Sequence, residues 1–92
     1  MITIKLSKEV EFEGKKYAEL SVDYDKLTGR DLMSAEREAS VLAGRPVMDI
    51  DKTYQAVLAA KAAGVISDMI VNLPAKDFVA VVGTAQDFLL GI

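Results

Sequence analysis

The 92-residue sequence contains no cysteine and no histidine. Disulfide bonds, thiol catalysis and histidine-based metal sites are therefore excluded. A nucleophilic relay would have to pair Ser or Thr with Lys, yet Ser34 and Ser40 have no Lys at helical spacing. Asp49 and Asp51 are not followed by the further ligands of a calcium loop, and no glycine-rich phosphate loop is present. The sequence predicts a protein that is not an enzyme and that holds no cofactor or metal ion.

An excess of positive charge is also missing. Eleven Lys and Arg residues stand against 14 Asp and Glu residues, which gives a net charge of −3. Nucleic-acid binders need clustered basic residues to displace counterions, so we expect no nucleic-acid partner. The lysines near the start alternate with glutamates, a mixture typical of a solvated face.

Long apolar runs are lacking as well. A membrane-spanning helix needs about 20 apolar residues, and Lys61, Asp68 and Lys76 interrupt the apolar half of the chain. Lys5 interrupts the opening residues, and no small-residue cleavage site follows it, so these residues do not resemble a signal peptide. We expect a cytoplasmic protein outside the membrane.

Apolar residues are nevertheless abundant, at 51% of the chain. The mean hydropathy of +0.22 is high for a single domain, residues 1–92, of this size. A domain this small hides roughly 60–65% of its unfolded surface. The surplus favours a homo-oligomer or the binding of a partner protein.

Residues 1–24 have the pattern of a β-hairpin. Apolar residues occupy alternate positions from Ile2 to Leu6, and the same parity continues at Val10 and Phe12. Glu13-Gly14 is typical of a tight turn. The return strand is predicted from about Lys16 to Asp23, with an apolar face made of Ala18, Leu20 and Val22.

Residues 28–92 are predicted to be helical. Thr28 and Asp31 resemble a capping box, and Gly44 with Pro46 ends the first helix. Its expected buried face consists of Leu32, Ala35, Ala39, Leu42 and Ala43. A second, alanine-rich helix begins near Asp49 or Asp51 and ends at Ala63; its small side chains let another helix approach closely. Its larger face consists of Tyr54, Val57, Leu58 and Ala62. Ser67 is expected to cap a short turn over residues 68–71.

The last helix is predicted from about Pro74 to Leu90, within the segment 65–92 around which we expect the chain to be organised. Proline at its start loses no hydrogen bond, and Asp77 in the first turn favours the helix dipole. Its apolar stripe is wider than one face. Gly83 is either a tolerated defect or a point of close contact with another helix. The stripe consists of Phe78, Val79, Val81, Val82, Ala85, Phe88, Leu89 and Leu90.

The predicted fold class is therefore α+β, with an N-terminal two-stranded antiparallel hairpin followed by three main helices and a short helical turn near residues 67–71. The wide stripe suggests a surface for self-association or partner binding, although some of its residues must belong to the core. The residues predicted to line this protein-binding surface are Met69, Ile70, Phe78, Val81, Val82, Phe88 and Leu89.

A series of short motifs resembles one known family. Residues 12–17 read F-E-G-K-K-Y, residues 19–22 read E-L-S-V, and residues 27–32 read L-T-G-R-D-L. The second half contains A-A-K-A-A-G-V, L-P-A-K-D-F and A-Q-D-F-L in the same order. Together these motifs resemble the tail assembly chaperones of long-tailed phages and prophages over nearly the whole chain.

The resemblance implies a non-enzymatic protein that binds the tape measure protein and keeps it soluble during tail assembly. The chaperone is then shed as the major tail protein, a second candidate partner, polymerises. Some members also form a longer product by ribosomal frameshifting. Two alternatives stay open: a structural component of the tail or baseplate, and a small acidic dimeric regulator of another protein.

Overall fold

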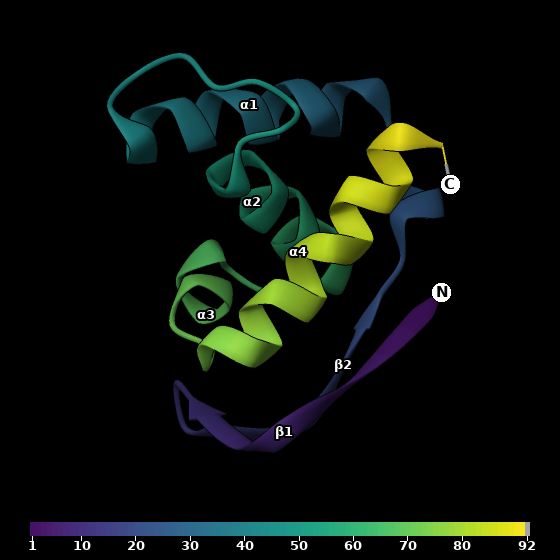
Figure 1. Cartoon of the computed structure of the whole chain (residues 1–92), viewed down its shortest axis with the longest axis vertical. Coiled ribbons are helices and arrows are strands. Elements are labelled where there is room, and N and C mark those ends of the chain that lie inside the picture. Colours follow the sequence, from purple (N-terminus) through teal and green to yellow (C-terminus); the bar gives the residue numbers. More distant parts are fainter. Residues whose placement is uncertain (92) are drawn as a thin grey trace.

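The centre of the molecule is helix α2 (Lys52–Ala63), as the computed structural model of the chain shows for the described residues 1–91 (Figure 1). Helices α1 (Gly29–Ala43), α3 (Ser67–Val71) and α4 (Ala75–Leu90) all contact α2, and so does strand β2 (Lys15–Val22). Every residue from Tyr54 to Ala60 is buried. The sequence had pointed to residues 65–92 as the organising segment, and this was wrong. Small alanine side chains let neighbours approach α2 from several sides, so it is buried nearly all round.

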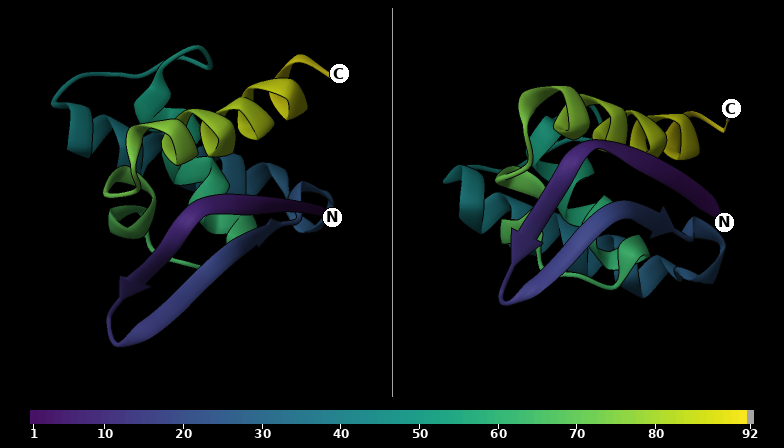
Figure 2. Two further views of the ribbon diagram at one scale, coloured as in Figure 1. Left: turned by 60° about the horizontal axis from the view of Figure 1, so that its bottom comes forward. Right: turned by 90° about the horizontal axis from the view of Figure 1, so that it is seen from below.

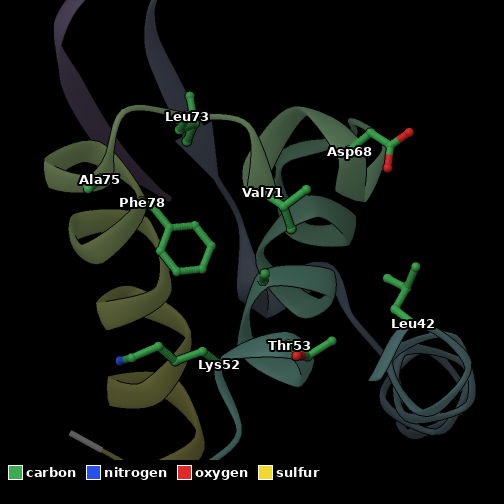
Figure 3. A pocket seen from close by; sticks show the side chains of 9 residues that line it. Leu42, Lys52, Thr53, Asp68, Val71, Leu73, Ala75 and Phe78 are labelled. Atoms are coloured by element: carbon green, nitrogen blue, oxygen red, sulfur yellow. The ribbon is translucent and has the colours of Figure 1, made fainter. Parts of the chain in front are cut away.

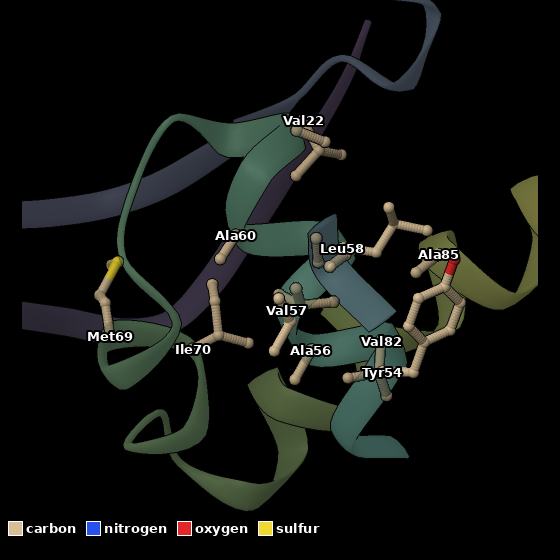
Figure 4. Packing of buried hydrophobic residues seen from close by; sticks show 14 of the residues in the cluster. Val22, Tyr54, Ala56, Val57, Leu58, Ala60, Met69, Ile70, Val82 and Ala85 are labelled. Carbon is tan, nitrogen blue, oxygen red and sulfur yellow. The ribbon is translucent and has the colours of Figure 1, made fainter. Parts of the chain in front are cut away.

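The core lies around α2 (Figure 4). Val57 and Leu58 of α2 are fully enclosed, and Ile70 of α3 and Val82 of α4 pack into the same cluster. The radius of gyration is 12.3 Å, close to the value of about 12 Å expected for a compact chain of this length. The predicted α+β class, a two-stranded hairpin followed by helices, is confirmed.

Strands β1 (Ile2–Phe12) and β2 form the predicted antiparallel hairpin. Glu13 and Gly14 connect them with φ values of 52° and 78°. Two consecutive positive φ values are the signature of a type I′ turn, whose twist matches that of the flanking strands. The turn predicted at Glu13-Gly14 is therefore confirmed.

The hairpin register shifts in its middle. Lys5 pairs with Glu19 but Val10 pairs with Tyr17, so four residues of β1 lie opposite Ala18 alone. Such a bulge bends the strands and changes which side chains face inward, and Figure 2 shows the curved hairpin. Leu20 and Val22 are buried as predicted, but Ala18 is exposed and Tyr17 packs on the core instead. The prediction for Ala18 was wrong because it assumed an unbroken ladder.

A buried carboxyl group attaches this bulge to α4. Ser7, within the shifted segment, donates its backbone N–H and its hydroxyl to the two carboxyl oxygens of Asp77, each over 2.9 Å. Asp77 is only 3% exposed and lies in the first turn of α4. It therefore joins strand to helix in addition to favouring the helix dipole.

The 3-10 turn η1 (Tyr24–Lys26) fixes the other end of the hairpin on α4. The Tyr24 ring stacks on Phe88 with 5.0 Å between centroids, and its hydroxyl shares a 2.7 Å hydrogen bond with Thr84. Burial raises the pKa of Tyr24, and the hydrogen bond to Thr84 opposes that effect.

Helix α1 has the expected ends: a reciprocal Thr28–Asp31 capping box, and Gly44 with φ 71° at its C-terminus. Ala35 and Ala39 are buried, but Leu42 is 54% exposed. The prediction that Leu42 is buried was wrong, because this end of the helix borders an open groove.

The remaining helices begin close to the predicted residues. Asp51 precedes α2, and Pro74 precedes α4. Ser67 is the first residue of α3 rather than its cap, and its hydroxyl donates to the Glu38 carboxylate of α1 over 2.8 Å. A Cβ atom at Gly83 would meet no atom within 4 Å, so no close helix contact within the chain requires this glycine.

Candidate protein-binding groove

The predicted binding residues do not form one surface. Four of them, Met69, Ile70, Val81 and Val82, are buried in the core around α2. The other three, Phe78, Phe88 and Leu89, are partly buried on α4. Phe78 and Phe88 are ten residues apart, or about 15 Å along a helix. Of the seven residues, only Phe78 lines the groove described next.

An open apolar groove of about 510 Å³ lies where the four α-helices meet (Figure 3). Its volume falls within the range of ordinary ligand pockets. Its lining comes from α1, α2, α3, α4 and the turn before α4. The lining residues are Leu42, Lys52, Thr53, Ala56, Asp68, Val71, Leu73, Ala75 and Phe78.

The apolar walls of the groove are positioned by local structure. The Phe78 N–H donates to the Pro74 carbonyl over 2.9 Å, which closes the first turn of α4 and fixes Phe78 on it. Leu73 is buried and anchors the turn, whereas Val71, at the end of α3, is 48% exposed. Across the groove, Leu42 contributes a second exposed apolar side chain. Removing such surface from water favours association with an apolar partner.

Sequence reasoning missed most of this groove. Leu42 had been assigned to the core, and Val71 had been given no role. No pattern within a single element marks these residues, because each wall comes from a different segment. A hydrophobic residue at the last position of a short helix, as at Val71, is a weak signal that becomes informative only once the neighbouring elements are placed.

The connector over residues 44–51 is held next to α2 by polar contacts. Arg45 forms a two-pronged ion pair with Asp51, at 3.1 and 3.2 Å, and Asp51 also accepts the Met48 N–H at 2.7 Å. These contacts, led by the Arg45 hydrogen bond, lower the pKa of Asp51. The buried Gln55 amide donates to the Asp49 carbonyl over 3.1 Å. The connector is thus fixed by polar bonds rather than by burial of all its apolar side chains.

Two large side chains of this connector point into solvent. Met48 is 69% exposed and Ile50 is 79% exposed, while Val47 between the helices is buried. In the sequence Met48 and Ile50 come four and two residues before Lys52, which lines the groove together with Thr53. Exposed apolar residues on a fixed backbone are suited to protein contacts, because little conformational entropy is lost when they are covered.

The described residues offer no alternative site with metal chemistry. Within residues 1–91, no group of three or more acidic side chains is arranged to hold a metal ion. In the same part of the chain, no helix is both long and apolar enough to cross a membrane.

Comparison with known proteins identifies the family. Residues 3–90 match the family described as phage tail assembly chaperone proteins, E, or 41 or 14. The chain belongs to this phage tail assembly chaperone family. No curated protein and no solved structure matched the chain. The match covers nearly the whole chain. It gives this tail assembly chaperone a role in the assembly of phage tails, a process that involves protein partners.

Proposed function

We propose that the chain binds the tape measure protein and keeps it soluble until the major tail protein polymerises around it. It acts in the cytoplasm of the host cell and without enzymatic activity. Family membership supports a role in tail assembly. The observation that carries the proposal is the open apolar groove between the helices, with exposed Leu42 of α1 and Val71 of α3 in its lining.

The groove is suited to a partner that is itself apolar and prone to aggregate. Phe78 and Leu73 form a hydrophobic wall of the groove. The exposed Met48 and Ile50 come shortly before Lys52 in the sequence, and Lys52 also lines the groove. Covering such a surface is favourable by about 25 cal/mol per Å² of apolar area. Outer faces rich in Lys and Glu keep the complex dispersed, because charged surfaces resist association.

Self-association is part of the same proposal. On α4, Val79 and Leu90 are exposed outside the groove, and a second copy of the chain could cover them. Phe88 and Leu89 stay predicted contact residues for this purpose. Sedimentation velocity over a range of protein concentrations tests this: a single monomeric species at every concentration would refute it.

The test is co-expression of the tagged chain with the tape measure protein of the same phage or prophage, followed by measurement of the soluble, co-purifying partner. We expect the partner to be soluble only when the chaperone is present. Leu42→Asp and Val71→Asp place a charge in the part of the groove lining that comes from α1 and from α3, and each should reduce recovery of the soluble partner severalfold.

Two matched variants control for general effects of a new surface charge. Met33→Asp lies on α1 like Leu42, and Ile66→Asp lies next to α3, which ends at Val71; both residues are exposed to a similar degree and neither lines the groove. We expect both controls to solubilise the partner normally. A partner that is insoluble in every case, or soluble alone without binding, would contradict the proposed function.

A mature-particle measurement separates the chaperone from a structural tail component. A chaperone should be absent from purified virions, whereas a baseplate or tail component should be present in fixed stoichiometry. Quantitative mass spectrometry of intact particles decides between the two.

A further inference from the structure

Two charged side chains of opposite sign border the apolar groove at opposite corners. Figure 3 shows Lys52 at one corner and Asp68 at the other, with Phe78, Val71 and Leu42 around the space between them. Both charged residues are exposed. Within residues 1–91 the one ion pair is Arg45–Asp51, so neither Lys52 nor Asp68 forms an ion pair with another described side chain. The groove therefore presents a positive end and a negative end to whatever occupies it.

The occupant is best matched by an α-helix. The groove is lined by helices and by the turn before α4, and no residue of β1 or β2 contributes to it. An added strand would need the unpaired backbone of a strand edge, and none is available at this place. A helix binds instead through apolar side chains at positions i, i+3, i+4 and i+7, which suits walls made of Leu42, Val71 and Phe78.

We propose that the groove receives one amphipathic helix of the partner in a single direction, with its N-terminal end at Asp68 and its C-terminal end at Lys52. A helix carries a partial positive charge at its N-terminus and a partial negative charge at its C-terminus. This direction places each end beside the opposite charge. Basic side chains in the first turn and acidic side chains in the last turn strengthen the match. The inference rests on the proposed function and adds the partner's structure and polarity.

The test uses two synthetic 18-residue helical peptides that share the same apolar stripe and the same staple on the outward face. The matched peptide has Arg in its first turn and Glu in its last turn, and the swapped peptide has these charges exchanged. Fluorescence anisotropy gives the dissociation constant of each peptide. Because each exposed ion pair contributes modestly, we expect the matched peptide to bind about fivefold more tightly at low salt.

Charge reversal in the protein should invert the preference. The double variant Lys52→Glu with Asp68→Lys keeps the net charge and should favour the swapped peptide by a similar factor. The control variant Glu11→Lys with Lys16→Glu also keeps the net charge, and it exchanges two residues that pair across the hairpin, away from the groove. The control should retain the original preference.

Three results would overturn the proposal. The peptides could bind equally, the preference could persist after Lys52 and Asp68 are reversed, or neither peptide could bind. If Val71→Asp abolishes self-association while neither peptide binds, the groove is an interface between copies of the chain. Failure of the proposed function can be told apart from failure of this inference. The co-expression experiment measures the solubility of the tape measure protein without any peptide.

Discussion

Single polar side chains in the interior of the protein have partners. Within residues 1–91 no buried side-chain nitrogen or oxygen lacks a hydrogen bond. Asp77 and Gln55 are the two buried polar residues, and each bonds to a segment outside its own helix. Because an unsatisfied buried polar group costs more than a typical hydrogen bond contributes, these contacts specify how the segments dock.

The Ser7–Asp77 contact is testable by two substitutions of graded effect. Asp77→Ala removes both hydrogen bonds and leaves the Ser7 N–H without its partner, so we expect a loss of about 2 kcal/mol of unfolding free energy. Ser7→Ala removes only the hydroxyl bond and should cost about 1 kcal/mol. Urea unfolding of both variants measures the difference. A loss for Ser7→Ala as large as that for Asp77→Ala would contradict the role of the backbone N–H.

Gly83 offers a stabilising substitution. Glycine within a helix costs about 0.8–1 kcal/mol relative to alanine, and a Cβ atom at this position meets nothing within 4 Å. Gly83→Ala should therefore raise the unfolding free energy of the chain by about that amount in thermal or urea unfolding. If the variant is instead less stable, and more so at high protein concentration, another copy packs closely on α4 at this residue.

The lowered pKa of Asp51 predicts that the unfolding free energy falls at acidic pH. Its pKa is lowered in the folded chain by Arg45 and by the Met48 N–H, whereas an unfolded Asp has a pKa of about 3.9. Folding therefore favours the ionised form, so its stabilising contribution is present above the unfolded pKa and is lost as the pH falls through the lower folded pKa. Asp51→Asn should be less stable than the parent chain near pH 7, and the difference should shrink below about pH 4. Urea unfolding at a series of pH values measures this, and a constant difference would refute it.

Local features of the helices and strands could be predicted from the sequence, whereas features that depend on several segments could not. The tight turn at Glu13-Gly14, the capping box and the C-cap at Gly44 follow from local chemistry and were predictable. The register shift opposite Ala18 was not, because alternation alone does not reveal extra residues in one strand. The exposure of Leu42 and the groove beside it depend on where four helices meet, which no single helical pattern encodes.

The central position of α2 depends on its small side chains. Ala59 is fully buried among the surrounding elements. Ala59→Leu would add three carbon atoms to a packed site, and overpacking of this kind costs about 1–3 kcal/mol. Ala80→Leu on the exposed face of α4 is the matched control and should change stability by only a few tenths of a kcal/mol. Chemical denaturation of the two variants should show this contrast, and equal effects would argue against close packing on α2.

On the scale of the whole molecule, the elements share one hydrophobic cluster. Leu20 and Val22 of the hairpin belong to the same cluster as Leu58 of α2 and Val82 of α4. The chain is predicted to unfold as a single domain, because removing any one element exposes part of this cluster. Circular dichroism reports the helices, and fluorescence of the buried Tyr24 and Tyr54 reports their packing. The two urea transitions should coincide, and separate midpoints would indicate that hairpin and helices unfold independently.

The groove between the α-helices exists only while these elements are assembled. An unfolded chain brings Leu42, Val71 and Phe78 into no common surface, so a helix that occupies the groove binds the native state alone. By mass action it then stabilises the fold by about 2.7 kcal/mol when its free concentration is 100 times its dissociation constant. On the proposed function, we expect the loaded chaperone to be the more durable form in the cell. Departure of the partner would return the chain to a state that unfolds, and is therefore degraded, more readily, which would couple the lifetime of the chaperone to the progress of tail assembly.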